Sequence, residues 1–118
     1  MSKVIQIFKE NKLLVKAKVY ANILLLAKGL RFSSPLQKGQ ALLLASSKED
    51  LATIDMLFVF FPIDAIWLDK NKRITHIVHN IQPFMLAVTP PRKAQYILEC
   101  QAGSTYMLKN NQKLIFKV

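Results

Sequence analysis

The chain has 118 residues, of which 52% are hydrophobic and 20% are charged, and its formal net charge is +10 at pH 7. This length suits one globular domain over residues 1–118, and the composition excludes collagen-like, linker-like and disordered chains. The basic excess has two interpretations: it attracts a polyanion such as nucleic acid or an anionic surface, or it serves solubility alone.

The first third of the chain predicts two strands and one helix. Residues 4–8 are mainly apolar, and residues 13–20 alternate apolar side chains with lysines, which is typical of a half-buried strand. Residues 22–30 favour a short helix, because Asn22 is a good N-cap, Gly29 can end a helix and the residues between them are helix formers. A buried strand is the alternative for this segment.

The middle of the chain is its most apolar part. Residues 41–45 predict a short buried strand, and residues 46–50 predict a polar loop. The apolar run that follows is interrupted by Pro62, which cannot donate a hydrogen bond to a sheet. We therefore expect two strands here, at residues 56–60 and 64–68. The run is too short to cross a bilayer, which takes roughly 20 residues.

The last part of the chain predicts three more strands. Residues 73–78 form a hairpin with the preceding strand, and residues 94–100 and 113–118 form the other two. Residues 80–93 are rich in loop signals, and residues 102–108 predict a turn or short helix. About eight short strands with one or two short helices predict a mainly β fold, built as a small antiparallel barrel or sandwich.

The usual signatures of catalysis and metal binding are missing from the sequence. It has no glycine-rich phosphate loop, no nucleophile elbow and no cysteine–histidine cluster. His76 and His79 would lie on opposite faces of a strand, which disfavours a shared metal. Cys100 is the one cysteine, so it forms no internal disulfide, and we expect it to be buried. We expect no catalytic residue, cofactor or metal, and a non-enzymatic role is favoured.

A buried carboxylate is the most informative candidate residue. Asp64 lies among large apolar side chains, where a bare charge is costly, so it needs hydrogen bonds or a charged partner. It is either a structural acceptor for backbone N–H groups of the turn after Pro62, or an acid–base group in a pocket. With Asp55 and Glu99 as further carboxylates, the predicted pocket consists of Asp64, Asn80, Glu99 and Asp55.

A second candidate site would bind anions. The basic residues that we assign to it are Lys16, Lys18, Lys70, Lys72, Arg73, Arg92 and Lys93. A single-stranded nucleic acid would also need exposed aromatic side chains for stacking. The aromatics expected to be exposed are Tyr20, Phe32, Phe84, Tyr96 and Tyr106. Those expected in the core are Phe58, Phe60, Phe61 and Trp67. No recognition motif accompanies these residues.

Two motifs carry a resemblance to a known family. Phe-Pro-Ile-Asp at residues 61–64 and Leu-Glu-x-x-Ala-Gly at residues 98–103 occur in order and with matching spacing. Over about residues 13–118 the chain resembles domain of unknown function 192, also called uncharacterised protein family 0127, and most closely its archaeal members. The resemblance implies a compact, mainly β fold and no established activity. The family's histidine is Asp55 here and its methionine is Val59, so any chemistry of those groups is lost.

Three functions remain open from the sequence. The first is a non-catalytic binding or accessory module with a groove near Asp64, Asn80 and Glu99. The second is a nucleic-acid or anionic-surface binder driven by charge, and the third is a carboxylate-based hydrolase. We expect a cytoplasmic protein, because charged residues interrupt the N-terminal segment where a signal sequence would need an apolar run.

Overall fold

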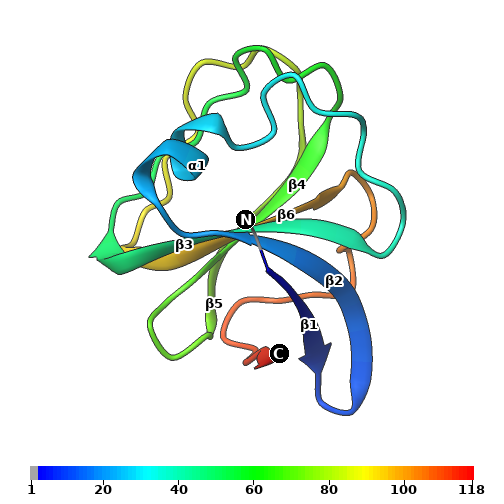
Figure 1. Ribbon diagram of the computed structural model, residues 1–118. Coiled ribbons are helices and arrows are strands. Elements are labelled where there is room, and N and C mark those ends of the chain that lie inside the picture. The colour runs from blue at the N-terminus through cyan, green and yellow to red at the C-terminus, as the bar shows by residue number, and fades with distance from the viewer. Residues whose placement is uncertain (1–2) are drawn as a thin grey trace.

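The computed structural model describes residues 3–118, and these are folded mainly as β-strands. The strands are β1 (Val4–Lys9), β2 (Lys12–Tyr20), β3 (Gln40–Asp50), β4 (Ile63–Leu68), β5 (Ile74–Ile81), β6 (Ala94–Gln101) and β7 (Ile115–Lys117). They form one sheet in the order β5-β4-β6-β3-β2-β1-β7 (Figure 1). Neighbouring strands are antiparallel, except that β2 and β3 are parallel. The mainly β prediction is confirmed, with seven strands in the described chain.

The parallel pair explains the one helix of the described residues. A parallel neighbour needs a crossover connection, and the crossover from β2 to β3 contains α1 (Ile23–Lys28). The Asn22 Oδ1 accepts a hydrogen bond from the Leu25 N–H at 2.9 Å, and the Gly29 N–H donates to the Leu25 carbonyl at 3.0 Å. Gly29 has φ +49°, a region that glycine adopts without strain. The predicted helix, its cap and its end are confirmed.

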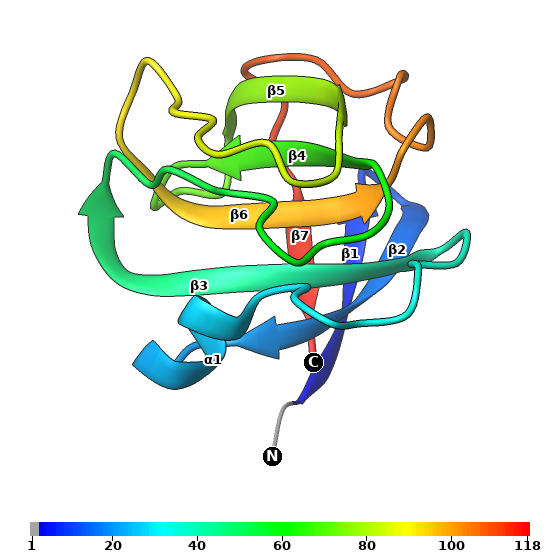
Figure 2. The same ribbon diagram turned by 90° about the horizontal axis from the view of Figure 1, so that it is seen from above.

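The sheet of residues 3–118 is not closed into a barrel. Its two end strands, β5 and β7, share no ladder. An isolated bridge between Arg73 and Lys113 and a hydrogen bond from the Ile74 N–H to the Gln112 carbonyl join the segments beside them. The sheet still curls strongly, because Ile7 of β1 and Ile66 of β4 lie in the same core although three strands separate β1 from β4. Figure 2 shows β5, β4, β6 and β3 side by side.

Two predicted segments are wrong. The expected polar loop at residues 46–50 is strand, because β3 continues to Asp50, which pairs with Ala94. The expected strand at residues 56–60 is instead a turn-containing loop. Phe58 has φ +60°, a left-handed conformation that ends an extended strand.

This loop crosses over one face of the sheet. It is held by a hydrogen bond from the Met56 N–H to the Met85 carbonyl at 2.7 Å. Its Met56 and Val59 side chains are buried, whereas Phe58 and Phe60, which the sequence predicted to be in the core, are exposed. The loop therefore turns Met56 and Val59 toward the sheet and two aromatic rings outward.

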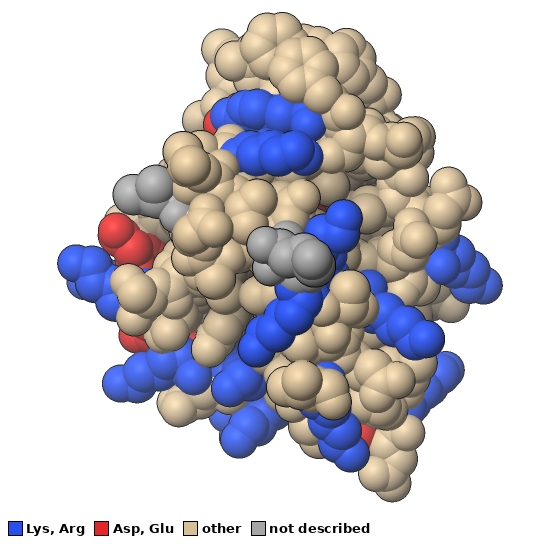
Figure 3. Space-filling view, in the orientation of Figure 1, with Lys and Arg blue, Asp and Glu red and all other residues tan. Residues whose placement is uncertain are grey.

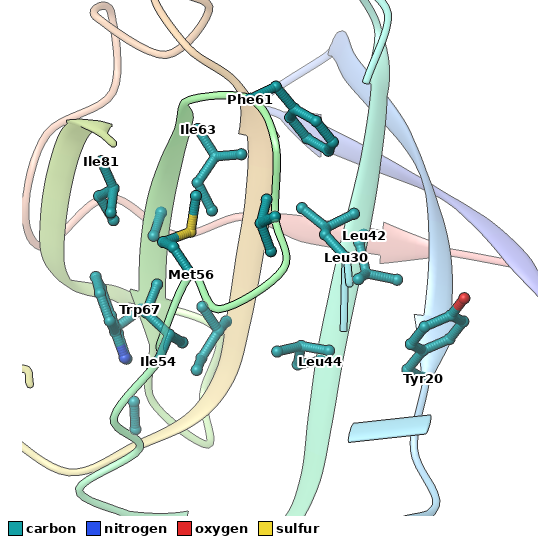
Figure 4. Packing of buried hydrophobic residues seen from close by; sticks show 14 residues of the cluster. Tyr20, Leu30, Leu42, Leu44, Ile54, Met56, Phe61, Ile63, Trp67 and Ile81 are labelled. Carbon is teal, nitrogen blue, oxygen red and sulfur yellow. The ribbon is translucent and has the colours of Figure 1, made fainter. Parts of the chain in front are cut away.

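Two hydrophobic cores lie on opposite faces of the sheet. All six residues of β4 are buried, so alternate side chains enter alternate cores. Ala65 and Trp67 point into the first core, against which Leu25 and Leu26 of α1 pack. Figure 4 shows Trp67 beside Ile54 and Met56 of the loop that crosses the sheet. Ile66 and Leu68 point into the second core.

α1 has only six residues, and no helix within residues 3–118 is long and apolar enough to span a membrane.

Candidate functional site

A small cavity opens between the first core, α1 and the loop that crosses the sheet. Its volume is about 290 Å³. Most of its lining residues are apolar, and they include Leu26, Leu30, Leu44, Ala52, Ile54, Met56, Val59, Ile63 and Ile97. Five polar or charged side chains also line it: Arg31, Ser46, Thr53, Asp55 and Glu99. An apolar cavity with a few convergent polar groups is the usual form of a small-molecule site.

Glu99 reaches this cavity because of its place in β6. Ile97 of the same strand points into the first core, and Glu99, two residues further, lies on the same face. The residue is only 5% exposed, and within residues 3–118 no hydrogen bond to its carboxyl group is found. Burial raises the pKa of Glu99 to about 7, an effect that Arg31 opposes and Asp55 reinforces. A carboxyl group with this pKa exchanges its proton near neutral pH.

Arg31 and Asp55 form an ion pair on the cavity wall. The Arg31 Nη2 lies 2.8 Å from the Asp55 Oδ2, and both side chains are about one-third exposed. The Asp55 Oδ1 also accepts a hydrogen bond from the Leu57 N–H at 3.0 Å. The pair therefore joins the segment after α1 to the loop that crosses the sheet. The sequence pattern did not single out Arg31, since nothing local indicates that Asp55 is its partner.

Asp64 does not belong to this cavity. In the register of β4 and β6 it faces Cys100, whereas Glu99 faces Ala65, so the two carboxyl groups point to opposite faces of the sheet. Asn80, the fourth residue of the predicted pocket, also lies away from the cavity, at the end of β5. The four predicted residues are thus not one site: the sheet separates Asp55 and Glu99 from Asp64.

The Asp64 carboxylate is fully buried and closely surrounded by hydrogen-bond donors. It accepts from the Asn80 N–H at 2.9 Å, the Gly103 N–H at 3.1 Å and the Thr105 hydroxyl at 2.7 Å. The His79 Nδ1 lies 3.3 Å away. Burial acts to raise the pKa of Asp64, but the hydrogen bonds from Asn80 and Thr105, together with His79, outweigh it, so the pKa lies below its ordinary value. The donors come from residues 80–105 and not from the turn after Pro62, where the sequence placed them.

The seven basic residues predicted to bind anions are divided between two places. Lys16 and Lys18 line a groove of about 810 Å³, together with Lys28 and Lys38, which the prediction did not include. The other five lie in the turn between β4 and β5 and directly before β6: Lys70, Lys72, Arg73, Arg92 and Lys93. Figure 3 shows basic side chains spread over the face of the molecule that Figure 1 presents.

Two of these five basic residues have partners within the described chain. The Lys72 Nζ lies 5.7 Å from the centre of the Tyr96 ring and 5.3 Å from that of Phe116. The Arg73 Nη1 donates to the Asn111 carbonyl at 3.0 Å. Lys28 of the groove also has partners, since its Nζ lies 3.4 Å from the Ser33 Oγ and 5.8 Å from the centre of the Tyr20 ring.

Comparison with known proteins places this fold in a family. The model of the DUF192 family, described as "Uncharacterized ACR", matches residues 5–115. A structure from Sinorhizobium meliloti, provisionally described as a transcription regulator, has a TM-score of 0.87 and 13% identity and covers 98% of this chain and 94% of its own. A protein of unknown function from Novosphingobium aromaticivorans has a TM-score of 0.86 and 19% identity, covering 97% and 84%. At these identities the likeness shows the fold alone. No curated protein matches the chain.

We expect Asp64→Asn to destabilise the protein by about 2–4 kcal/mol, because the amide keeps one acceptor oxygen and turns an NH₂ group toward backbone donors. The loss should appear in urea unfolding at pH 7. Because the folded pKa of Asp64 is lowered, its stabilisation is present above the unfolded pKa and disappears as pH falls through the folded pKa. Asp50→Asn, at an exposed position, is the control and should stay within about 0.5 kcal/mol. Equal effects of the two variants would contradict a structural role for Asp64.

We expect Glu99→Gln to change how stability depends on pH. The unfolded chain releases the Glu99 proton near pH 4.5, whereas the folded chain keeps it until about pH 7. The free energy of unfolding therefore falls as pH rises between these values, by roughly 3 kcal/mol. In urea unfolding at several pH values, Glu99→Gln should lack this loss and exceed the wild type above pH 7. Glu10→Gln, at an exposed residue, should retain it, and an unchanged slope in Glu99→Gln would refute the assignment.

Proposed function

The chain belongs to the DUF192 family, which is described as uncharacterised, and we propose from its cavity that it binds small apolar molecules that carry a protonated amine. The observation that carries this proposal is the Glu99 carboxyl group, which is buried against the cavity and receives no hydrogen bond from residues 3–118. The archaeal resemblance and the cytoplasmic location stay predictions.

The size and lining of the cavity support a small, mainly apolar ligand. At about 290 Å³ it lies at the lower end of the range for small-molecule sites, roughly 300–1,000 Å³. Side chains such as Leu30, Met56 and Ile97 would contact the apolar body of the ligand, and its transfer from water would supply most of the affinity. Binding does not require Asp64, which has all its partners within the fold.

The charges of the cavity favour a cationic group. Arg31 and Asp55 already neutralise each other at 2.8 Å, so ionised Glu99 is the charge that remains to be paired. A buried carboxylate without a partner is costly, and this cost is what raises the pKa of Glu99. An ammonium group next to Glu99 would pair with it, stabilise its ionised form and displace its proton.

The test uses hexylamine, benzylamine and 2-phenylethylamine as probes, with hexanol, benzyl alcohol and hexanoate as neutral and anionic counterparts. Calorimetry at pH 6 and pH 8 should show amine binding with release of a proton at the lower pH. Because the ionised fraction of a group with a pKa of about 7 rises about tenfold over this interval, the affinity should rise about tenfold. Chemical shifts of Leu30, Ile54 and Ile97 should report the cavity.

Glu99→Gln should abolish this pH dependence and weaken amine binding, and Glu10→Gln, the same change at an exposed site, should leave both unchanged. Equal affinity for the amine, the alcohol and the carboxylate would disprove recognition by Glu99. Shifts confined to residues outside the cavity would disprove the site.

A second candidate function is carboxylate-based hydrolysis, and one observation favours it: Asp55 and Glu99 line the same cavity. Glu99, with a pKa of about 7, has the proton affinity that a general acid–base group needs at neutral pH. Asp55, paired with Arg31, would be the second carboxylate. Such a mechanism needs both groups to reach one bond of the substrate.

Hydrolysis and binding differ in turnover. p-Nitrophenyl acetate and p-nitrophenyl β-glucoside serve as model substrates for ester and glycoside cleavage. If the protein is a hydrolase, it should release p-nitrophenol from one of them faster than buffer does, and Glu99→Gln should lower that rate about 100-fold or more. Glu10→Gln should not change the rate. Amine binding without release of p-nitrophenol would decide in favour of the binding function.

A further inference from the structure

A group of exposed apolar side chains gathers on three neighbouring loops, and we call it the aromatic tip. Its members are Phe32, Leu57, Phe58, Phe60, Phe84, Met85 and Leu86, and each is between 39% and 75% exposed. They come from the segment after α1, the loop that crosses the sheet and the loop after β5, which lie together at the top of Figure 1. Single exposed apolar residues are common, but a continuous group of this size marks an interaction surface.

The four phenylalanine rings pack on one another. The rings of Phe32 and Phe58 are stacked with their centres 4.9 Å apart, and Phe60 meets Phe84 edge to face at 5.2 Å. The Phe32–Phe60 and Phe58–Phe84 centres are 6.3 Å and 6.1 Å apart. The rings therefore form one organised apolar surface and not four independent exposures.

The backbone of the tip is held in an unusual conformation. Phe32, Phe58 and Phe84 have φ angles of +57°, +60° and +64°. Bulky residues rarely adopt this left-handed conformation, and such strain collects at functional sites. Backbone hydrogen bonds of 2.9 Å hold it, from the Phe32 N–H to the Phe58 carbonyl and from the Phe84 N–H to the Met56 carbonyl. The fold thus maintains a strained backbone beneath an exposed apolar surface.

Positive charge adjoins the tip. Phe32 also lines the groove of Lys16, Lys18, Lys28 and Lys38, in which no acidic residue takes part. In Figure 3 basic side chains lie below the top of the molecule, and the top itself is almost free of charged groups. An apolar end bordered by lysines complements an anionic lipid surface, whose acyl region accepts apolar groups and whose headgroups attract cations.

We propose that the aromatic tip inserts into the surface of an anionic phospholipid bilayer, with the lysines of the groove against its headgroups. Leu57, Met85 and Leu86 favour lipid over single-stranded nucleic acid, because aliphatic side chains gain little from bases. The Phe32 and Phe58 rings stack on each other, so they already use faces that bases would need. The proposal does not depend on the amine-binding cavity.

The test is co-sedimentation with phosphatidylcholine vesicles that contain 30% phosphatidylserine, compared with vesicles of phosphatidylcholine alone. The wild type should bind the anionic vesicles, and more strongly at low salt. Phe60→Ser with Leu86→Ser, both at residues without a left-handed backbone, should lower partitioning tenfold or more. Leu24→Ser with Tyr106→Ser removes equally exposed apolar groups elsewhere and should leave binding unchanged. Thermal unfolding confirms that each variant is folded.

The charge test uses Lys16→Gln with Lys18→Gln, which should weaken binding about 25-fold, because each lysine near an anionic surface contributes about fivefold. Lys109→Gln with Lys113→Gln is the control of equal charge change. Glu99→Gln should bind vesicles as the wild type does, which separates this proposal from the cavity.

Three outcomes would overturn the proposal. The first is absence of binding to the anionic vesicles. The second is binding to a 20-residue oligothymidylate at the same salt concentration that is tighter than vesicle binding and depends on the tip, which would identify a nucleic-acid surface. The third is a dimer that the Phe60→Ser and Leu86→Ser changes dissociate without affecting vesicle binding, which would identify a contact between copies.

Discussion

The central strands β4 and β6 are buried on both faces, and the alternation of side chains along them decides into which core each group points. Asp64 enters the second core, and Glu99 enters the first. Neither carboxyl group can reach the other, because the sheet lies between them. This constraint makes one carboxylate part of the scaffold and leaves the other beside a cavity.

The surroundings of these two carboxyl groups differ in their supply of donors. Asp64 meets two backbone N–H groups and the Thr105 hydroxyl, so its charge is stabilised and it ties β4 to the end of β5 and to the loop after β6. Glu99 is surrounded mainly by apolar side chains, with Arg31 acting on it only as a nearby charge. Burial of a carboxylate costs free energy in both places. Hydrogen bonds within the fold offset this cost for Asp64, whereas Glu99 has no such hydrogen bonds from residues 3–118.

The cavity and the aromatic tip share their supporting loops. Arg31 and Asp55 line the cavity, and the adjacent Phe32 and Phe58 form part of the tip. The ion pair at 2.8 Å and the hydrogen bond from the Phe32 N–H to the Phe58 carbonyl join the same two segments. In both segments, some side chains face the cavity and their neighbours in the sequence face outward. The residues that close the cavity therefore also place the phenylalanine rings.

Local pattern alone determined the strands at residues 13–20, 64–68 and 94–100, and the helix between Asn22 and Gly29, because alternation and capping act over a few residues. It also required that a carboxylate in β4 be hydrogen-bonded. Only the tertiary structure decided which groups do so, since they lie 16 to 41 residues further along the chain. The pairing of Arg31 with Asp55, the separation of the carboxyl groups and the outward phenylalanines depend in the same way on strand order and loop closure, which no local pattern encodes.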